Sequence, residues 1–132
     1  VHRNYCKSLD LNETQPHSPK IDALGTESIN PEKEVVKIQL NSFSPPETFV
    51  LEGEKPRLVC DFFGVGLHEE VDTEIKGKGE LIDKIRIGCH RKPEKKVRVV
   101  VDLICSKKYE IQQIFFKKEN LYTLVLTEKP SK

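Results

Sequence analysis

The stretch Val97-Arg98-Val99-Val100-Val101-Asp102-Leu103 is the clearest structural signal in this chain of 132 residues. Successive side chains of a β-strand point to opposite faces, so the odd-numbered residues of this stretch would form a wholly apolar face. Arg98 and Asp102 would lie on the other face, beside Val100. β-branched residues also favour strands. The stretch therefore predicts a strand with one side in a core and the other in water.

Shorter runs with the same period of two occur along the chain. Pro, Gly and Lys clusters separate them, and no run has the period of an amphipathic helix. The last two runs flank residues 117–120, which suits a hairpin with a four-residue loop. The further strand candidates are Val36–Leu40, Thr48–Glu52, Arg57–Phe62, Ile85–Cys89, Tyr109–Phe116 and Leu121–Thr127, and residues 67–79 could hold a turn or a short strand.

These runs predict an all-β domain over residues 35–130. We expect a sandwich of two antiparallel sheets built from about six to eight short strands. Residues 1–34 are rich in Pro and polar residues and have no sustained period, which predicts a flexible tail or linker. The chain contains no Met, so we expect a fragment or a processed product. The longest apolar run, Val99–Cys105, is far shorter than the roughly 20 residues that span a bilayer, so no membrane span is expected.

A repeat links two of the predicted strands. Arg57-Leu58-Val59-Cys60-Asp61-Phe62 matches Arg98-Val99-Val100-Val101-Asp102-Leu103 in its Arg, Val and Asp positions. Within one strand the Arg and the Asp would lie about 13 Å apart, too far to pair with each other. If the two copies lie in different sheets, each outer face carries one Arg-Val-Asp strip. The strips could form cross-strand ion pairs, or they could bind a ligand whose carboxylates suit the planar Arg fork.

The charge balance is near zero overall but uneven along the chain. There are 22 basic and 21 acidic residues, a net charge of +1, which argues against a protein that binds polyanions through bulk charge. Residues 83–118 alone hold 11 basic and 4 acidic residues, a net charge of +7. Single-stranded nucleic acid could use this segment with Tyr109, Phe115 and Phe116 as stacking platforms. Alternation places Phe115 and Phe116 on opposite faces, so we expect at least one in the core and no nucleic-acid binding.

Catalytic and metal-binding motifs are absent from the sequence. There is no C-x-x-C, H-E-x-x-H, G-x-S-x-G or glycine-rich phosphate loop, so we predict no enzyme activity, no metal site and no cofactor. Cys60, Cys89 and Cys105 share the parity of the apolar residues in their segments. They could be small buried hydrophobes, or two of them, with Cys60 and Cys105 the most plausible pair, could form a core disulfide.

Three segments in order resemble the AMIN domain, the non-catalytic module of bacterial cell-wall amidases and type IV pilus secretins. They are Pro56–Gly64, Ile85–His90 and Val97–Leu103, followed by Tyr109 and a hairpin ending at Leu126. The resemblance implies a two-sheet sandwich, a periplasmic or cell-envelope location, and related motifs on both outer faces. The three cysteines, where aliphatic or small residues are usual, and the unmatched residues 68–79 depart from it.

The resemblance also implies a role in targeting, through peptidoglycan or an envelope protein. The residues expected to contact the ligand are Arg57, Asp61, Arg86, Arg98 and Asp102. The alternative is a protein docking module of a pilus, secretin or cell-division assembly, in which a sheet edge or the Lys-rich hairpin binds the partner by strand addition.

Overall fold

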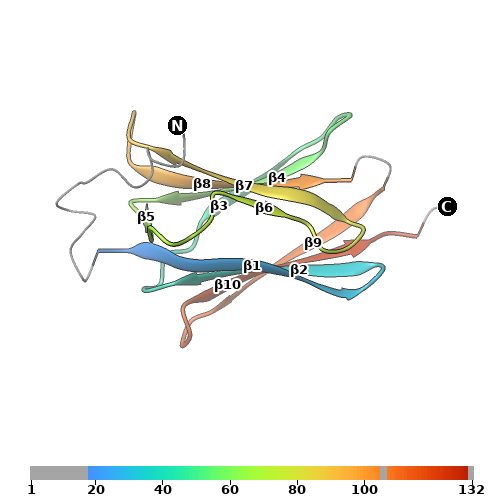
Figure 1. Ribbon diagram of the computed structural model, residues 1–132, viewed down its shortest axis with the longest axis horizontal. Coiled ribbons are helices and arrows are strands. Elements are labelled where there is room, and N and C mark those ends of the chain that lie inside the picture. Colours follow the sequence, from blue (N-terminus) through green and yellow to red (C-terminus); the bar gives the residue numbers. More distant parts are fainter. Residues whose placement is uncertain (1–17, 105–106, 131–132) are drawn as a thin grey trace.

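Two five-stranded β-sheets face each other in the computed structural model, which describes residues 18–104 and 107–130 (Figure 1). In the first sheet the strand order is β5 (Gly66–Leu67), β1 (Lys20–Asn30), β2 (Lys33–Leu40), β10 (Leu121–Glu128) and β9 (Tyr109–Phe116). In the second sheet it is β3 (Glu47–Leu51), β4 (Arg57–Phe63), β8 (Lys96–Leu103), β7 (Ile82–His90) and β6 (Glu74–Lys76). All neighbouring strands are antiparallel except β1 and β5. The predicted all-β sandwich is confirmed.

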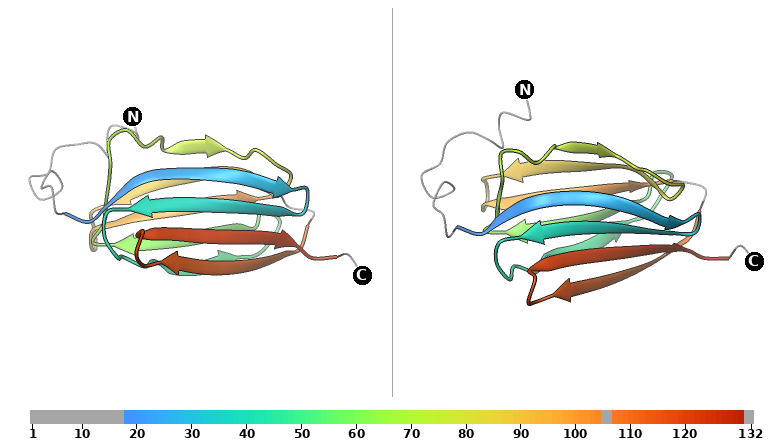
Figure 2. Two further views of the ribbon diagram at one scale, coloured as in Figure 1. Left: turned by 90° about the horizontal axis from the view of Figure 1, so that it is seen from below. Right: turned by 60° about the horizontal axis from the view of Figure 1, so that its bottom comes forward.

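The core lies between the two layers, which Figure 1 shows from the side, while Figure 2 shows the first sheet in front of the second. Strand β8 follows the predicted alternation, because Val97, Val99 and Val101 are at most 1% exposed while Arg98 and Val100 are only partly buried. Strand β7 buries Ile85 and Ile87 in the same way. The first sheet contributes Ile21, Val36, Ile38, Leu40, Tyr122, Leu124 and Leu126.

The sandwich begins earlier in the chain than predicted. Residues 20–34, assigned to the tail, form β1 and the start of β2, so that part of the tail prediction was wrong. Strand β1 escaped notice because its register shifts twice, between Ile21 and Ala23 and between Ser28 and Asn30, which breaks the alternation. Residues 1–17 lie outside the described residues. With the short strands β5 and β6, the described chain has ten strands, more than predicted.

The two copies of the repeat lie side by side in one sheet. Strands β4 and β8 are antiparallel neighbours, so Arg57 lies opposite Asp102 and Asp61 lies opposite Arg98. The expectation that the copies would occupy different sheets and give both outer faces a strip is therefore wrong for this chain. Both copies carry Arg and, four residues later, Asp. Because the two strands run antiparallel, each Arg lies opposite the Asp of the other copy.

Polar groups join the sheets across the apolar core. The fully buried Glu34 carboxylate of β2 accepts hydrogen bonds from the amides of Leu81 (2.9 Å) and Ile82 (3.2 Å) at the start of β7. The Tyr109 hydroxyl donates to the carbonyl of Ile104 (2.6 Å). A third link joins the hydroxyls of Thr48 and Tyr122 (3.0 Å).

The cysteines divide into two kinds. Cys60 is fully buried and free, as one of the two alternatives expected, so the other alternative, a Cys60–Cys105 disulfide, is wrong. Burial is the main reason that the pKa of Cys60 rises to about 11. Cys89 is disulfide-bonded, which also corrects the alternative that all three are free thiols. Cys105 lies outside the described residues.

Candidate functional site

The outer face of the second sheet carries all five residues that the sequence predicted as ligand contacts. Arg57 and Asp61 lie on β4, Arg98 and Asp102 on β8, and Arg86 on β7. All five alternate with the core residues of their strands, and on β4 two residues of this outer row, Val59 and Asp61, are themselves buried at 2% and 4% exposure. The register sets them in rows across the sheet, so that they form two clusters around two carboxylates.

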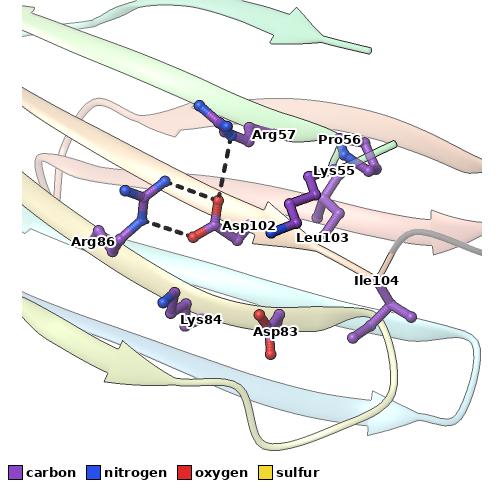
Figure 3. A pocket seen from close by; sticks show the side chains of 9 residues that line it. All are labelled: Lys55, Pro56, Arg57, Asp83, Lys84, Arg86, Asp102, Leu103 and Ile104. Carbon is purple, nitrogen blue, oxygen red and sulfur yellow. Dashed lines mark hydrogen bonds and ion pairs between the residues drawn. The ribbon is translucent and has the colours of Figure 1, made fainter. Parts of the chain in front are cut away.

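The first cluster surrounds Asp102, as Figure 3 shows. Arg86 donates two hydrogen bonds to this carboxylate, from Nε to Oδ2 (2.7 Å) and from Nη2 to Oδ1 (3.0 Å). This bidentate contact is the main reason that the pKa of Arg86 is raised. Arg57 approaches from the other side with Nε 3.8 Å from Oδ1. Among the described residues Arg57 makes no hydrogen bond through its guanidinium, and its side chain is 43% exposed, so its donors face outward.

The second cluster surrounds Asp61 and is more closed. Arg98 binds this carboxylate through Nε (2.8 Å) and Nη2 (2.9 Å), and Lys96 Nζ lies 3.3 Å from Oδ2. The Asp61 side chain is only 6% exposed. The hydrogen bonds from Arg98 are the largest cause of the lowered pKa of Asp61. Both cations also lie over aromatic rings, Arg98 over Phe49 (5.7 Å to the ring centroid) and Lys96 over Phe63 (5.4 Å).

A pocket of about 450 Å³ opens beside the Asp102 cluster. Its charged lining consists of four cationic and two anionic side chains, a net charge of +2. They are Lys55, Arg57, Lys84, Arg86, Asp83 and Asp102, and we call this place the Asp102 pocket. Because the cations outnumber the carboxylates, the pocket favours a ligand with at least one negative group. The two carboxylates, Asp83 and Asp102, are hydrogen-bond acceptors that suit an ammonium or amide group in the same ligand.

The structure separates the predicted residues into two groups. Arg57, Arg86 and Asp102 line the pocket, whereas Asp61 and Arg98 lie farther along the face and do not. Sequence reasoning missed Lys84 and Lys96. Lys84 shares the parity of Arg86, and Lys96 shares that of Arg98, so the alternation that identified the arginines could have found both lysines.

A family model described as AMIN domain matches residues 26–126. The chain belongs to the AMIN domain family. The match includes β4, β7 and β8, which carry both carboxylate clusters, and it begins within β1. Searches of curated proteins and of solved structures found no match. AMIN domains are periplasmic, envelope-associated modules that mediate interactions with envelope proteins or peptidoglycan, and the domain itself is non-catalytic.

Two further observations concern the described residues. No helix among them has the length and apolar character needed to cross a bilayer. In residues 18–104 and 107–130, no group of three or more His, Cys, Asp or Glu side chains is arranged to hold a metal ion.

Proposed function

We propose that this AMIN domain targets its parent protein to the cell wall by binding peptidoglycan on the outer face of the second sheet. The observation that carries the proposal is the Asp102 pocket, where Arg57 presents unused guanidinium donors beside the Arg86–Asp102 pair. Peptide stems of the wall polymer carry carboxylates, amides and amines. A guanidinium binds a carboxylate through two parallel hydrogen bonds, so Arg57 would hold the stem carboxylate.

Arg86 and Asp102 would act together in this site. Their bidentate pair fixes both side chains at the pocket wall, while Lys84 adds a second cation nearby. Asp61 and Arg98 would extend the same face, but their charges already satisfy each other. We therefore expect them to contribute less to binding than Arg57. The disulfide at Cys89 agrees with an oxidising compartment such as the periplasm.

Co-sedimentation with purified sacculi tests the proposal. Arg57→Ala should weaken binding at least about tenfold, because it removes charge-assisted hydrogen bonds worth roughly 1.5–3 kcal/mol. Arg98→Ala should have a smaller effect. Lys37→Ala is the matched control, because Lys37 lies in the first sheet and pairs with Glu27 at 3.3 Å.

Soluble muropeptides provide the second measurement. They should compete with sacculi and perturb the Arg57 and Arg86 side-chain resonances in NMR spectra. Equal sedimentation of wild type and a folded Arg57→Ala variant, with no resonance perturbed by muropeptides, would refute the proposal.

A further inference from the structure

A second pocket, of about 440 Å³, lies between the edge strands β3 and β9 of the two sheets. We call it the β3–β9 groove. Its apolar wall includes Val50, Tyr109 and Ile111, and its cationic end is formed by Lys107, Lys108 and Lys129. The groove opens between the layers of the sandwich and shares two lining residues, Pro56 and Leu103, with the Asp102 pocket, but none of the charged residues of that pocket.

The outer edge of β3 has free backbone groups. The hydrogen bonds between β4 and β8 show which backbone groups of β4 face β3. The amide of Leu103 on β8 donates to the carbonyl of Pro56, just before β4 (3.0 Å), so these two opposite residues form a hydrogen-bonded pair. Hydrogen-bonded and non-bonded pairs alternate along antiparallel strands, so Arg57, Val59 and Asp61 turn their amides and carbonyls toward β3. Their partners on β3 are Glu47, Phe49 and Leu51. The amides and carbonyls of the other two β3 residues, Thr48 and Val50, therefore point away from β4, where no described strand pairs with them.

The side chains of β3 are also unusually exposed. Phe49, Val50 and Leu51 are 40%, 44% and 45% exposed. Val50 has the parity of the inward-facing Thr48, yet it remains open because nothing in the described chain covers it at the groove. An exposed edge with unpaired backbone groups and apolar side chains is a template for pairing with another strand, even over the five residues of β3.

The charges at one end of the groove select the occupant. Lys107 pairs with Glu128 at 3.4 Å, but Lys108 and Lys129 are exposed and have no carboxylate within ion-pair distance among the described residues. The backbones of Lys108 and Lys129 are joined by a 2.8 Å hydrogen bond, which holds the two residues side by side. One carboxylate, Glu52, lies in the same lining. The lysine end is therefore cationic.

We propose that the β3–β9 groove binds an extended segment of a partner protein, which adds a strand to β3. Its backbone pairs with Thr48 and Val50, its alternate apolar side chains cover Val50 and Ile111, and an acidic residue at one end meets Lys108 and Lys129. A second copy of this chain fits less well. Two β3 strands paired antiparallel would bring Pro46, not a carboxylate, to the lysine end.

The test uses labelled nine-residue peptides of alternating Val and Thr with two Asp at either the N- or the C-terminal end, measured by fluorescence anisotropy. One of the two should bind, and replacing its Asp residues with Lys should weaken binding about tenfold. N-methylation of alternate amides should abolish binding, because it removes the donors that pair with the edge. Failure of both acidic peptides to bind more tightly than their Lys counterparts overturns the proposal.

Variants of the protein test the same proposal by changing the groove instead of the peptide. Val50→Pro should abolish peptide binding but keep the β4 ladder, because the Val50 amide points away from β4. The double variant Lys108→Glu, Lys129→Glu should lose about tenfold in affinity, while the exposed Lys33→Glu control, on β2, should bind as wild type. If Val50→Pro does not fold, the lysine variants and the methylated peptide decide.

Two other results are informative. Dimerisation in sedimentation velocity that Val50→Pro removes, without peptide binding, would assign the edge to a second copy and overturn the proposal. Sacculus binding should persist in Val50→Pro, so this proposal and the peptidoglycan proposal succeed or fail separately.

Discussion

Replacing Asp61 and Asp102 separately with Asn should destabilise the domain to different degrees, although the two residues occupy equivalent places in the repeat. Asp61 accepts three hydrogen bonds from cations, and its side chain is 6% exposed. Asp102 accepts two such bonds, but its partners Arg86 and Arg57 are 44% and 43% exposed. If the carboxylate is lost, water can therefore solvate the cations around Asp102 more easily than those around Asp61.

The magnitudes follow from that difference. Asp61→Asn removes charge assistance from bonds worth roughly 1.5–3 kcal/mol each, and partial hydration of Arg98 recovers some of it, so we expect a loss of about 2 kcal/mol. Asp102→Asn breaks a largely exposed pair and should cost about 0.5–1 kcal/mol. The two losses differ by about 1–1.5 kcal/mol, so at about 2–8 °C per kcal/mol for domains near this size Asp61→Asn should melt at least ~2 °C below Asp102→Asn.

The pH dependence gives an independent check. Arg98 lowers the pKa of Asp61 in the folded state, so this carboxylate contributes stability above its unfolded pKa of about 3.9, and the contribution is lost as the pH falls toward the folded pKa. The gap between wild type and Asp61→Asn should therefore be constant from pH 5 to 7 and should close below about pH 4.

Urea unfolding at several pH values, with the Tm from circular dichroism, measures both effects. Equal losses for the two variants would refute the assignment of Asp61 as the more structural carboxylate. A gap for Asp61→Asn that persists unchanged at pH 2 would refute the electrostatic reasoning.

Three further outcomes are expected. Burial raises the pKa of Cys60 to about 11, so this thiol should resist iodoacetamide at pH 8 in the folded protein and react only in denaturant. Peptide mass mapping would show the labelled site, and labelling of Cys60 without denaturant would contradict its burial. Glu34→Gln should lower the free energy of unfolding by about 1–3 kcal/mol in urea titrations, because Leu81 and Ile82 bind different oxygens and the NH2 group that replaces one of them cannot accept a hydrogen bond; a neutral effect would count against the buried link. Gly77→Ala should cost about 1–3 kcal/mol by the same measurement, since the added Cβ would clash with the backbone carbonyl of Ile82, and wild-type stability would show that the backbone at Gly77 adjusts freely.

Part of the second sheet was predictable because β8 alternates strictly between buried and partly exposed residues and the middle of β7 follows the same period. Alternation alone placed Arg57, Arg86 and Asp102 on a water-facing surface, and it placed Val97, Val99, Val101 and Leu103 in the core. The hairpin loop at residues 117–120 was confirmed for the same reason, with Asn120 in the left-handed region at φ 54°.

The pairing of strands was not predictable, because it depends on contacts far apart in the sequence. Parity says which face a residue takes but not which sheet its strand joins, so the two strips were assigned to two faces rather than to one. Glu34 was missed for a similar reason. Its donors, Leu81 and Ile82, lie 47 and 48 residues away, so local sequence gives no sign that a carboxylate there would be buried.

The polar links between the sheets have a mechanical meaning. Apolar contact resists the separation of two layers but allows them to slide, because it has no direction, whereas a hydrogen bond holds its atoms in line. Glu34 ties β2 to β7, the Thr48–Tyr122 hydroxyl pair ties β3 to β10, and Tyr109 ties β9 to the segment after β8. Because these ties involve separate strands, a force that pulls the two sheets in opposite directions meets several directed bonds at once, and the layers resist shear as one body.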